Sequence, residues 1–193
     1  MVAEIARLGA INSLAQTAIK LTAPGVPDID QGTEIWDDSL VDPDNRRPID
    51  YARRREMLTQ IENVPANELM QCWPDGRIKM RLTQRLLHLR RENPELFREG
   101  NYEPINFGGA FADCAIGFVR RHRDRAIIVI VPRLSSRVGF PPIGDRWQGT
   151  HVVMPGGLSD LRDVFSDREL CVENSRLRLA EAMSQLPFAV LQS

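Results

Sequence analysis

The sequence predicts an α+β protein in which a helical part is followed by an antiparallel β part. Apolar residues recur at helical spacing as far as Arg91, and the chain then changes to short apolar runs separated by Gly, Pro, Asp and Asn. This second pattern, short apolar runs separated by turn residues, is typical of an antiparallel β-sandwich. We therefore expect a boundary near residues 93–102, with one domain over residues 1–100 and a second over residues 101–193.

The helical part contains three segments with helical periodicity. They are Ile5–Ile19, Ile49–Ile61 and Arg77–Arg91. Pro24 and Gly25 end the first pattern, and Pro94 lies just beyond the third, as expected for residues that stop helices. Asp50 lies near the start of the second segment. Between the first two helices, Val26–Ile29 is too short for a helix and predicts a brief buried strand.

The second part contains six candidate strands. They are Ala115–Val119, Ala126–Val131, His151–Met154, Leu161–Phe165, Arg176–Leu179 and Pro187–Leu191. The run Ala126–Val131 has no polar residue, which indicates a central strand covered on both faces. We expect it to pair with residues 115–121 through a turn at residues 122–125.

Composition excludes several classes of function. Of 193 residues, 42% are hydrophobic and 26% charged, as in globular proteins, and the net charge of −1 provides no positive field for nucleic acid or anionic membranes. No apolar run approaches the ~18 residues of a membrane span. Cys72, Cys114 and Cys171 lie far apart without CxxC spacing, which argues against a disulfide framework or a zinc site. We expect a cytoplasmic protein without a metal or cofactor.

Residues 28–44 form the part of the chain richest in carboxylates. It holds seven carboxylates, namely Asp28, Asp30, Glu34, Asp37, Asp38, Asp42 and Asp44. Asn45, Arg46 and Arg47 follow at once. Carboxylates and Asn share hydrogen bonds with hydroxyl groups, Arg adds a rigid fork of donors, and Trp36 offers a face for a sugar ring. Spacing alone favours the alternative of a solvated acidic loop that is neutralised by neighbouring arginines.

Other catalytic motifs are missing from the sequence. His88, His122 and His151 are isolated, and the chain contains no G-x-S-x-G elbow, no GxxxxGK[ST] loop and no EF-hand order of ligands. Serine hydrolysis, nucleotide binding and calcium binding therefore have no support.

Several ordered strings resemble maltooligosyltrehalose synthases. They are Ala10–Thr17, Leu21–Ile29, Gln31–Glu34, Ser39–Pro48, Asp75–Lys79, Leu86–Arg91, Val129–Arg133, Arg162–Val164 and Leu186–Leu191. The block V-D-P-D-N-R-R-P over residues 41–48 is specific to this resemblance. The pattern P-x-x-x-Q-G-x-E over residues 27–34 is shared more widely among α-amylase-type enzymes.

The resemblance implies a carboxyl-terminal part of a longer enzyme. In such an enzyme a (β/α)8 barrel precedes an antiparallel β domain, so Val26–Ile29 would be the last barrel strand and residues 30–48 its catalytic-face loop. The whole enzyme would convert the reducing-end α-1,4 linkage of a maltooligosaccharide into an α,α-1,1 linkage by intramolecular transglucosylation, as a step of trehalose biosynthesis.

The resemblance also implies that this chain holds no catalytic residue. Retaining enzymes of this class use two carboxyl groups ~5 Å apart, supplied by different barrel strands. The family's catalytic carboxylates would precede Met1, so the fragment alone would be inactive. The residues that would contact a maltooligosaccharide or glucan are Asp42, Asp44, Asn45, Arg46, Arg47 and Trp36.

Two other functions remain open at this point. The chain could be a stand-alone glucan-binding or protein-interaction module, or a hydrolase built on Asp42 and Asp44. A separated barrel part would expose apolar helix faces, so self-association is expected. Asp30 stands where family members carry Tyr, and a carboxylate at a buried strand end must be paired or solvated.

Overall fold

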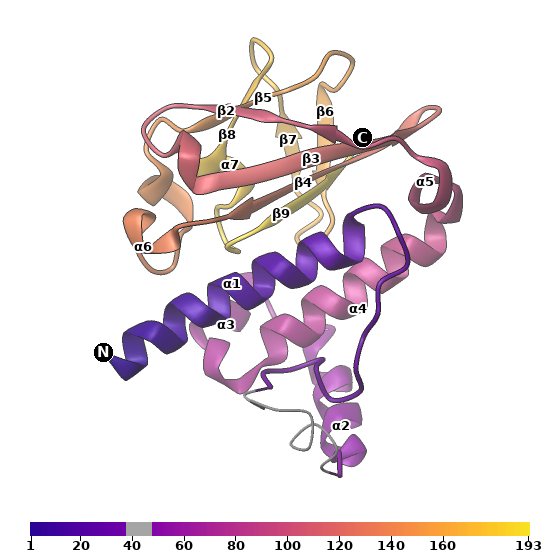
Figure 1. The fold of residues 1–193 in the computed structure, drawn as a ribbon, viewed down its shortest axis with the longest axis vertical. Helices are drawn as coiled ribbons and strands as arrows, with labels where there is room; N and C mark the ends of the chain where they lie inside the picture. The colour runs from indigo at the N-terminus through magenta and orange to yellow at the C-terminus, as the bar shows by residue number, and fades with distance from the viewer. Residues whose placement is uncertain (38–47) are drawn as a thin grey trace.

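The computed structural model describes residues 1–37 and 48–193. Figure 1 shows a layer of helices that packs against one of two antiparallel sheets. The described helices are α1 (Val2–Thr22), α2 (Tyr51–Ile61), α3 (Ala66–Gln71), α4 (Arg77–Glu92), α5 (Pro94–Glu99), α6 (Ser135–Val138) and α7 (Leu179–Ala182). The three predicted helices are confirmed as α1, α2 and α4, whereas the short helices were not predicted.

Local capping explains where α2 and α4 begin. The Asp50 carboxylate accepts a hydrogen bond from the Arg53 amide at 2.9 Å, which satisfies one of the free N–H groups at the start of α2. Gly76 precedes α4 with a φ of 83°, and a Cβ at this position would lie 2.8 Å from the Ile35 Cβ. Only glycine adopts this conformation without strain and leaves room for Ile35.

Nine strands form the two sheets of the described chain. They are β1 (Glu103–Pro104), β2 (Asn106–Gly108), β3 (Ala115–His122), β4 (Arg125–Pro132), β5 (His151–Val153), β6 (Asp160–Asp163), β7 (Glu169–Cys171), β8 (Arg176–Arg178) and β9 (Ala189–Gln192). One sheet has the order β1-β3-β4-β9-β6-β7 and the other β2-β5-β8. The predicted hairpin is confirmed, because β3 and β4 pair in register from Ala115 opposite Pro132 to His122 opposite Arg125.

Strand β4 is covered on both faces, as its apolar sequence predicted. Ile127 and Val129 belong to a cluster shared with the helices, whereas Ile128 and Ile130 belong to a second cluster shared with the smaller sheet. All four side chains are fully buried. The larger sheet is therefore the middle layer of the fold (Figure 1).

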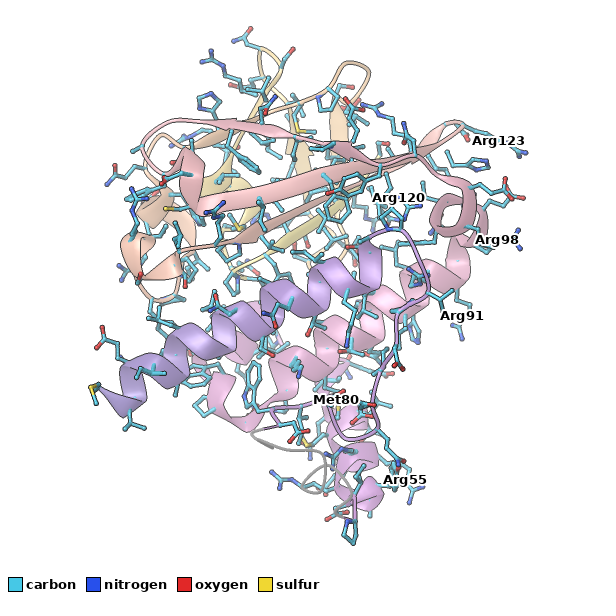
Figure 2. All side chains as sticks on the ribbon, viewed as in Figure 1. Arg55, Met80, Arg91, Arg98, Arg120 and Arg123 are labelled. Carbon is cyan, nitrogen blue, oxygen red and sulfur yellow. The ribbon has the colours of Figure 1, made fainter. Side chains whose placement is uncertain are left out.

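A buried arginine connects the helices to this middle layer. Arg120 of β3 is 1% exposed and lies between the sheet and the helical layer (Figure 2). Its guanidinium donates to the carbonyls of Thr22 at 3.2 Å, at the end of α1, and of Gly100 at 2.8 Å, after α5. Its Nε donates to the Asn101 carbonyl, and Nη2 also lies within hydrogen-bonding distance of the Leu96 and Phe97 carbonyls.

The predicted strand at Val26–Ile29 is wrong. These residues have no strand pairing in the described chain, and Val26 is 95% exposed. A strand requires a hydrogen-bonding neighbour, and the described strands all lie from Glu103 onward in the other part of the molecule. Asp30 is exposed, so its carboxylate is solvated where a buried strand end would have required a partner.

Among the described residues, every helix is too short or too polar to cross a membrane.

Candidate functional site

Most of the sequence-predicted sugar contacts lie outside the described residues. This holds for Asp42, Asp44, Asn45, Arg46 and Arg47, which fall within residues 38–47. Trp36 is described, at the end of a segment that runs from Asp28 to Asp37 and leads into residues 38–47. The candidate site is therefore built from this segment, which we call the acidic segment, and from the helices that hold it.

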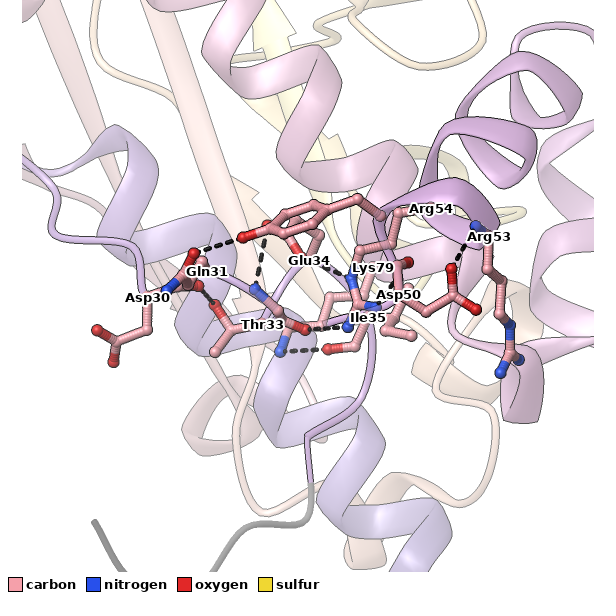
Figure 3. Close-up of polar contacts among 11 residues, drawn as sticks. Asp30, Gln31, Thr33, Glu34, Ile35, Asp50, Arg53, Arg54 and Lys79 are labelled. Carbon is pink, nitrogen blue, oxygen red and sulfur yellow. Dashed lines mark hydrogen bonds and ion pairs between the residues drawn. The ribbon is translucent and has the colours of Figure 1, made fainter. Parts of the chain in front are cut away.

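Arg54 of α2 anchors the middle of the acidic segment (Figure 3). Its Nε donates to Glu34 Oε2 at 3.2 Å, and its Nη2 donates to the Gly32 carbonyl at 2.9 Å. The second Glu34 carboxylate oxygen accepts from the Gly32 amide at 3.3 Å. Glu34 and Arg54 are both partly buried, so this ion pair is less screened by solvent than an exposed one.

The start of the segment is held by further polar contacts (Figure 3). The Thr33 hydroxyl donates to the Asp30 carbonyl at 2.7 Å, and the Tyr51 hydroxyl donates to Gln31 Oε1. Gly32 has a φ of 96°, a conformation that side chains rarely adopt. The Q-G-x-E pattern is thus explained locally, because Gly makes the turn and Glu pairs with Arg54.

Trp36 packs against Trp73 and lies beside Lys79. Its indole N–H donates to the Trp73 carbonyl at 2.7 Å, and the two rings meet edge to face with centroids 6.2 Å apart. Lys79 Nζ lies 5.9 Å from the Trp36 ring centroid. These contacts already use the indole N–H, and they fix the ring at the point where the acidic segment meets α4. Stacking of a sugar on Trp36 stays a prediction.

Lys79 of α4 holds the end of the acidic segment. Its ammonium donates to the Ile35 carbonyl at 3.1 Å. Burial lowers the pKa of Lys79, and the positive charge of Lys20 lowers it further, whereas Asp37 and Glu34 act in the opposite direction. The side chain of Lys79 therefore lies in a partly desolvated position beside charges of both signs.

A polar cavity of about 390 Å3 lies between α1, the acidic segment and α4. It is lined by Ser13, Gln16, Thr17, Lys20, Leu21, Asp28, Ile29, Asp30, Thr33, Asp37, Lys79 and Thr83. Sequence reasoning missed the two lysines as site residues, although their rarity in an arginine-rich chain was a usable signal. Within residues 1–37 and 48–193, no group of three or more His, Cys, Asp or Glu side chains is placed to hold a metal ion.

Comparison with solved structures first shows a shared fold. An Anoxybacillus α-amylase superposes on 94% of this chain with a TM-score of 0.58 at 18% identity, and the match covers 32% of that enzyme. This likeness shows a shared fold with part of an α-amylase structure. No model of a protein family matches the chain.

Closer relatives then identify the family. The maltooligosyltrehalose synthase structure from Arthrobacter ramosus covers 98% of this chain with a TM-score of 0.77 at 37% identity. A putative maltooligosyl trehalose synthase of Mycobacterium tuberculosis strain H37Rv is 40% identical over 146 residues, or 76% of this chain. The chain is a homologue of maltooligosyltrehalose synthase. It spans 23% of the length of the Arthrobacter structure and 16% of the Mycobacterium protein.

Proposed function

We propose that this chain is the carboxyl-terminal part of a maltooligosyltrehalose synthase and supplies part of its substrate-binding wall. The enzyme as a whole would convert the reducing-end α-1,4 linkage of a maltooligosaccharide to an α,α-1,1 linkage by intramolecular transglucosylation. The observation that carries this proposal is the match of nearly the whole chain to the Arthrobacter enzyme at 37% identity. The predicted contacts are Asp42, Asp44, Asn45, Arg46, Arg47 and Trp36.

The packing supports a barrel-derived helical part and a β-sandwich after it. Helices α1 and α4 lie side by side and bury Leu14 and Leu86 in one cluster (Figure 1). The two sheets face one another across a second cluster that includes Val152 and Leu177 of the smaller sheet. We infer that residues 1–100 correspond to the terminal part of a (β/α)8 barrel and residues 101–193 to an antiparallel β-sandwich.

Two of the described carboxyl groups, those of Glu34 and Asp163, hold local structure. A retaining reaction needs two carboxyl groups ~5 Å apart on either side of the glycosidic bond. Glu34 is engaged by Arg54 and by the Gly32 amide. Asp163, whose pKa is raised by burial, accepts from the Phe165 and Ser166 amides in the turn after β6. This arrangement fits the proposal that other parts of the whole enzyme carry catalysis.

Incubation with maltohexaose tests the absence of catalysis. We expect the chain alone neither to remove reducing ends, as formation of a trehalose terminus would, nor to release reducing sugar. Turnover of either kind would contradict the proposal. Release of reducing sugar that is abolished by Asp42→Asn or Asp44→Asn would instead identify a hydrolase built on Asp42 and Asp44.

The Arthrobacter enzyme provides the test of the binding role. Substitutions matching Asp44→Asn and Arg46→Gln, made at the aligned positions of that enzyme, should raise KM for maltohexaose by about tenfold each, as expected for loss of one hydrogen bond to substrate. A substitution matching Arg91→Gln, on an exposed part of α4, is the control. If KM is unchanged in the first two variants, the loop is not part of the substrate wall. Glucan binding by this chain combined with that result would favour a stand-alone binding module.

A further inference from the structure

The two lysines of the chain line the same cavity. Among 25 lysine and arginine residues, only Lys20 and Lys79 are lysines. Lys20 lies on α1 and Lys79 on α4, yet both line the cavity beside the acidic segment. Every other Lys or Arg position holds arginine, so both ammonium side chains of the protein lie at this cavity.

The cavity has the volume of a small-molecule site, and three separate elements of the fold line it. Its volume of about 390 Å3 falls in the range of about 300–1,000 Å3 typical of ligand pockets. Three separate elements contribute polar groups: α1 contributes Thr17, α4 contributes Thr83, and the acidic segment contributes Asp28 and Asp30. Arg54 and Lys79 hold the acidic segment at both its middle and its end, so the wall is anchored.

The charges that line the cavity favour a neutral ligand rich in hydroxyl groups. Two ammonium groups face three carboxylates, those of Asp28, Asp30 and Asp37. Because these charges of opposite sign largely cancel, the lining gives no strong preference for an ionic ligand of either sign. A sugar hydroxyl both donates and accepts, so it can satisfy a carboxylate and an ammonium group at once. An ammonium on a flexible stem fits this task in a small space better than a planar guanidinium.

The groups that would contact such a ligand are accessible. Lys20, Asp28 and Asp30 are exposed at the cavity, and their side chains make no hydrogen bond with other residues that the structure describes. Lys79 donates one hydrogen bond to the Ile35 carbonyl and lies beside the Trp36 ring, and its ammonium group has three N–H donors.

We propose that the cavity between α1, the acidic segment and α4 binds a glucosyl unit of a maltooligosaccharide, with Lys20, Asp28 and Asp30 as direct contacts. Lys79 contributes a donor and fixes the segment that carries Asp37. Its residues are different from the predicted contacts at residues 42–47. The inference rests on the proposed function for the identity of the sugar.

Calorimetric titration of the full chain with maltohexaose tests the proposal. Lys20→Met and Asp30→Ala should each raise Kd by about tenfold, the effect of one lost hydrogen bond to a charged group. Arg91→Met, an exposed substitution on α4 outside the cavity, should leave Kd unchanged. Circular dichroism and thermal unfolding of each variant establish that the fold is retained. In the amide NMR spectrum, maltohexaose should shift the signals of Thr17 and Thr83.

Three outcomes would overturn the cavity site. The first is an absence of maltohexaose binding by the chain, and the second is tight binding of inorganic phosphate in its place. The third is binding that Asp44→Asn weakens but that Lys20→Met and Asp30→Ala leave unchanged. That third outcome would place the sugar on residues 42–47, so the proposed function would stand while the cavity site failed. The kinetic test in the Arthrobacter enzyme decides the proposed function independently of all three.

Discussion

The guanidinium of Arg120 lies over the ring of Phe97, with Cζ 6.0 Å from the ring centroid, and Arg120 Nη2 donates to the Phe97 carbonyl at 3.2 Å. Arg90 lies over the same ring at 4.7 Å and donates to the Leu21 carbonyl at 3.0 Å. Two cations thus bind carbonyls at the end of α1, where the helix dipole is negative. Backbone carbonyls, together with a ring face, stabilise the buried charge of Arg120.

Arg120→Lys should therefore lower the free energy of unfolding by about 2–4 kcal/mol, because an ammonium cannot reach the carbonyls that a guanidinium fork spans, and several would lose their donor. Urea unfolding followed by circular dichroism measures this change. Arg91→Lys, an exposed substitution of the same type, should change stability by less than about 0.5 kcal/mol. Equal effects of the two substitutions would show that the buried network does not stabilise the fold.

Arg54→Met should loosen the acidic segment while leaving the rest of the chain folded. The substitution removes the donors to Glu34 and to the Gly32 carbonyl. Loss of about 1–2 kcal/mol of local stability corresponds to roughly tenfold faster amide exchange in residues 32–37. Hydrogen–deuterium exchange with mass spectrometry resolves this segment. Arg55→Met, on the exposed side of α2 (Figure 2), should leave its exchange unchanged.

Asp163 should make stability fall as pH rises through the acidic range. Burial raises the pKa of Asp163 in the folded chain, although hydrogen bonds from Phe165 and Ser166 oppose this effect. The unfolded chain therefore releases this proton first, near its ordinary value of about 3.9, and the cost of a buried charge appears from there up to the folded pKa. The free energy of unfolding of the wild type, relative to that of Asp163→Asn, should therefore fall over this pH window. Above the folded pKa, the difference between the two proteins should stay constant. Urea unfolding between pH 3 and 7 tests this, and a difference that does not vary with pH would refute it.

Gly117→Ala should destabilise the middle sheet by about 1–3 kcal/mol, the usual cost of forcing atoms into a packed site. A Cβ at Gly117 would lie 2.6 Å from the Val129 carbonyl oxygen and 2.9 Å from Ile105 Cδ1. At Gly149 a Cβ would meet nothing within 4 Å, so Gly149→Ala is the matched control. Thermal unfolding that is the same for both variants would contradict this packing argument.

The sequence predicted those elements that carry their own signal. The spacing of Ile5, Leu8 and Ile11 predicts α1 because one apolar stripe repeats with the helical period. The uninterrupted run of β4 predicts burial on both faces, as observed. The strand prediction for Val26–Ile29 was wrong because a short extended segment forms a strand only beside a hydrogen-bonding partner. A local sequence pattern does not reveal whether such a partner is near.

The candidate site was predicted only in part, for a similar reason. The carboxylates of the acidic segment are adjacent in sequence and could be recognised as a group. The two lysines belong to different helices, and their approach depends on how α1 and α4 pack. Trp36 was expected as a sugar platform, but its neighbour Trp73 could be identified only in three dimensions.

The shared apolar cluster has a consequence for dissecting the chain. Phe118, Ile127, Val129 and Val190 of the larger sheet pack in the same cluster as Leu14 of α1 and Leu86 of α4. If residues 101–193 were produced alone, they would present this row of side chains to water, and Arg120 would lose its carbonyl partners at the ends of α1 and α5. We expect such a shortened polypeptide to aggregate unless a substitute for the helical layer is supplied. Glucan binding should therefore be mapped with point variants of the whole chain and not with deletions.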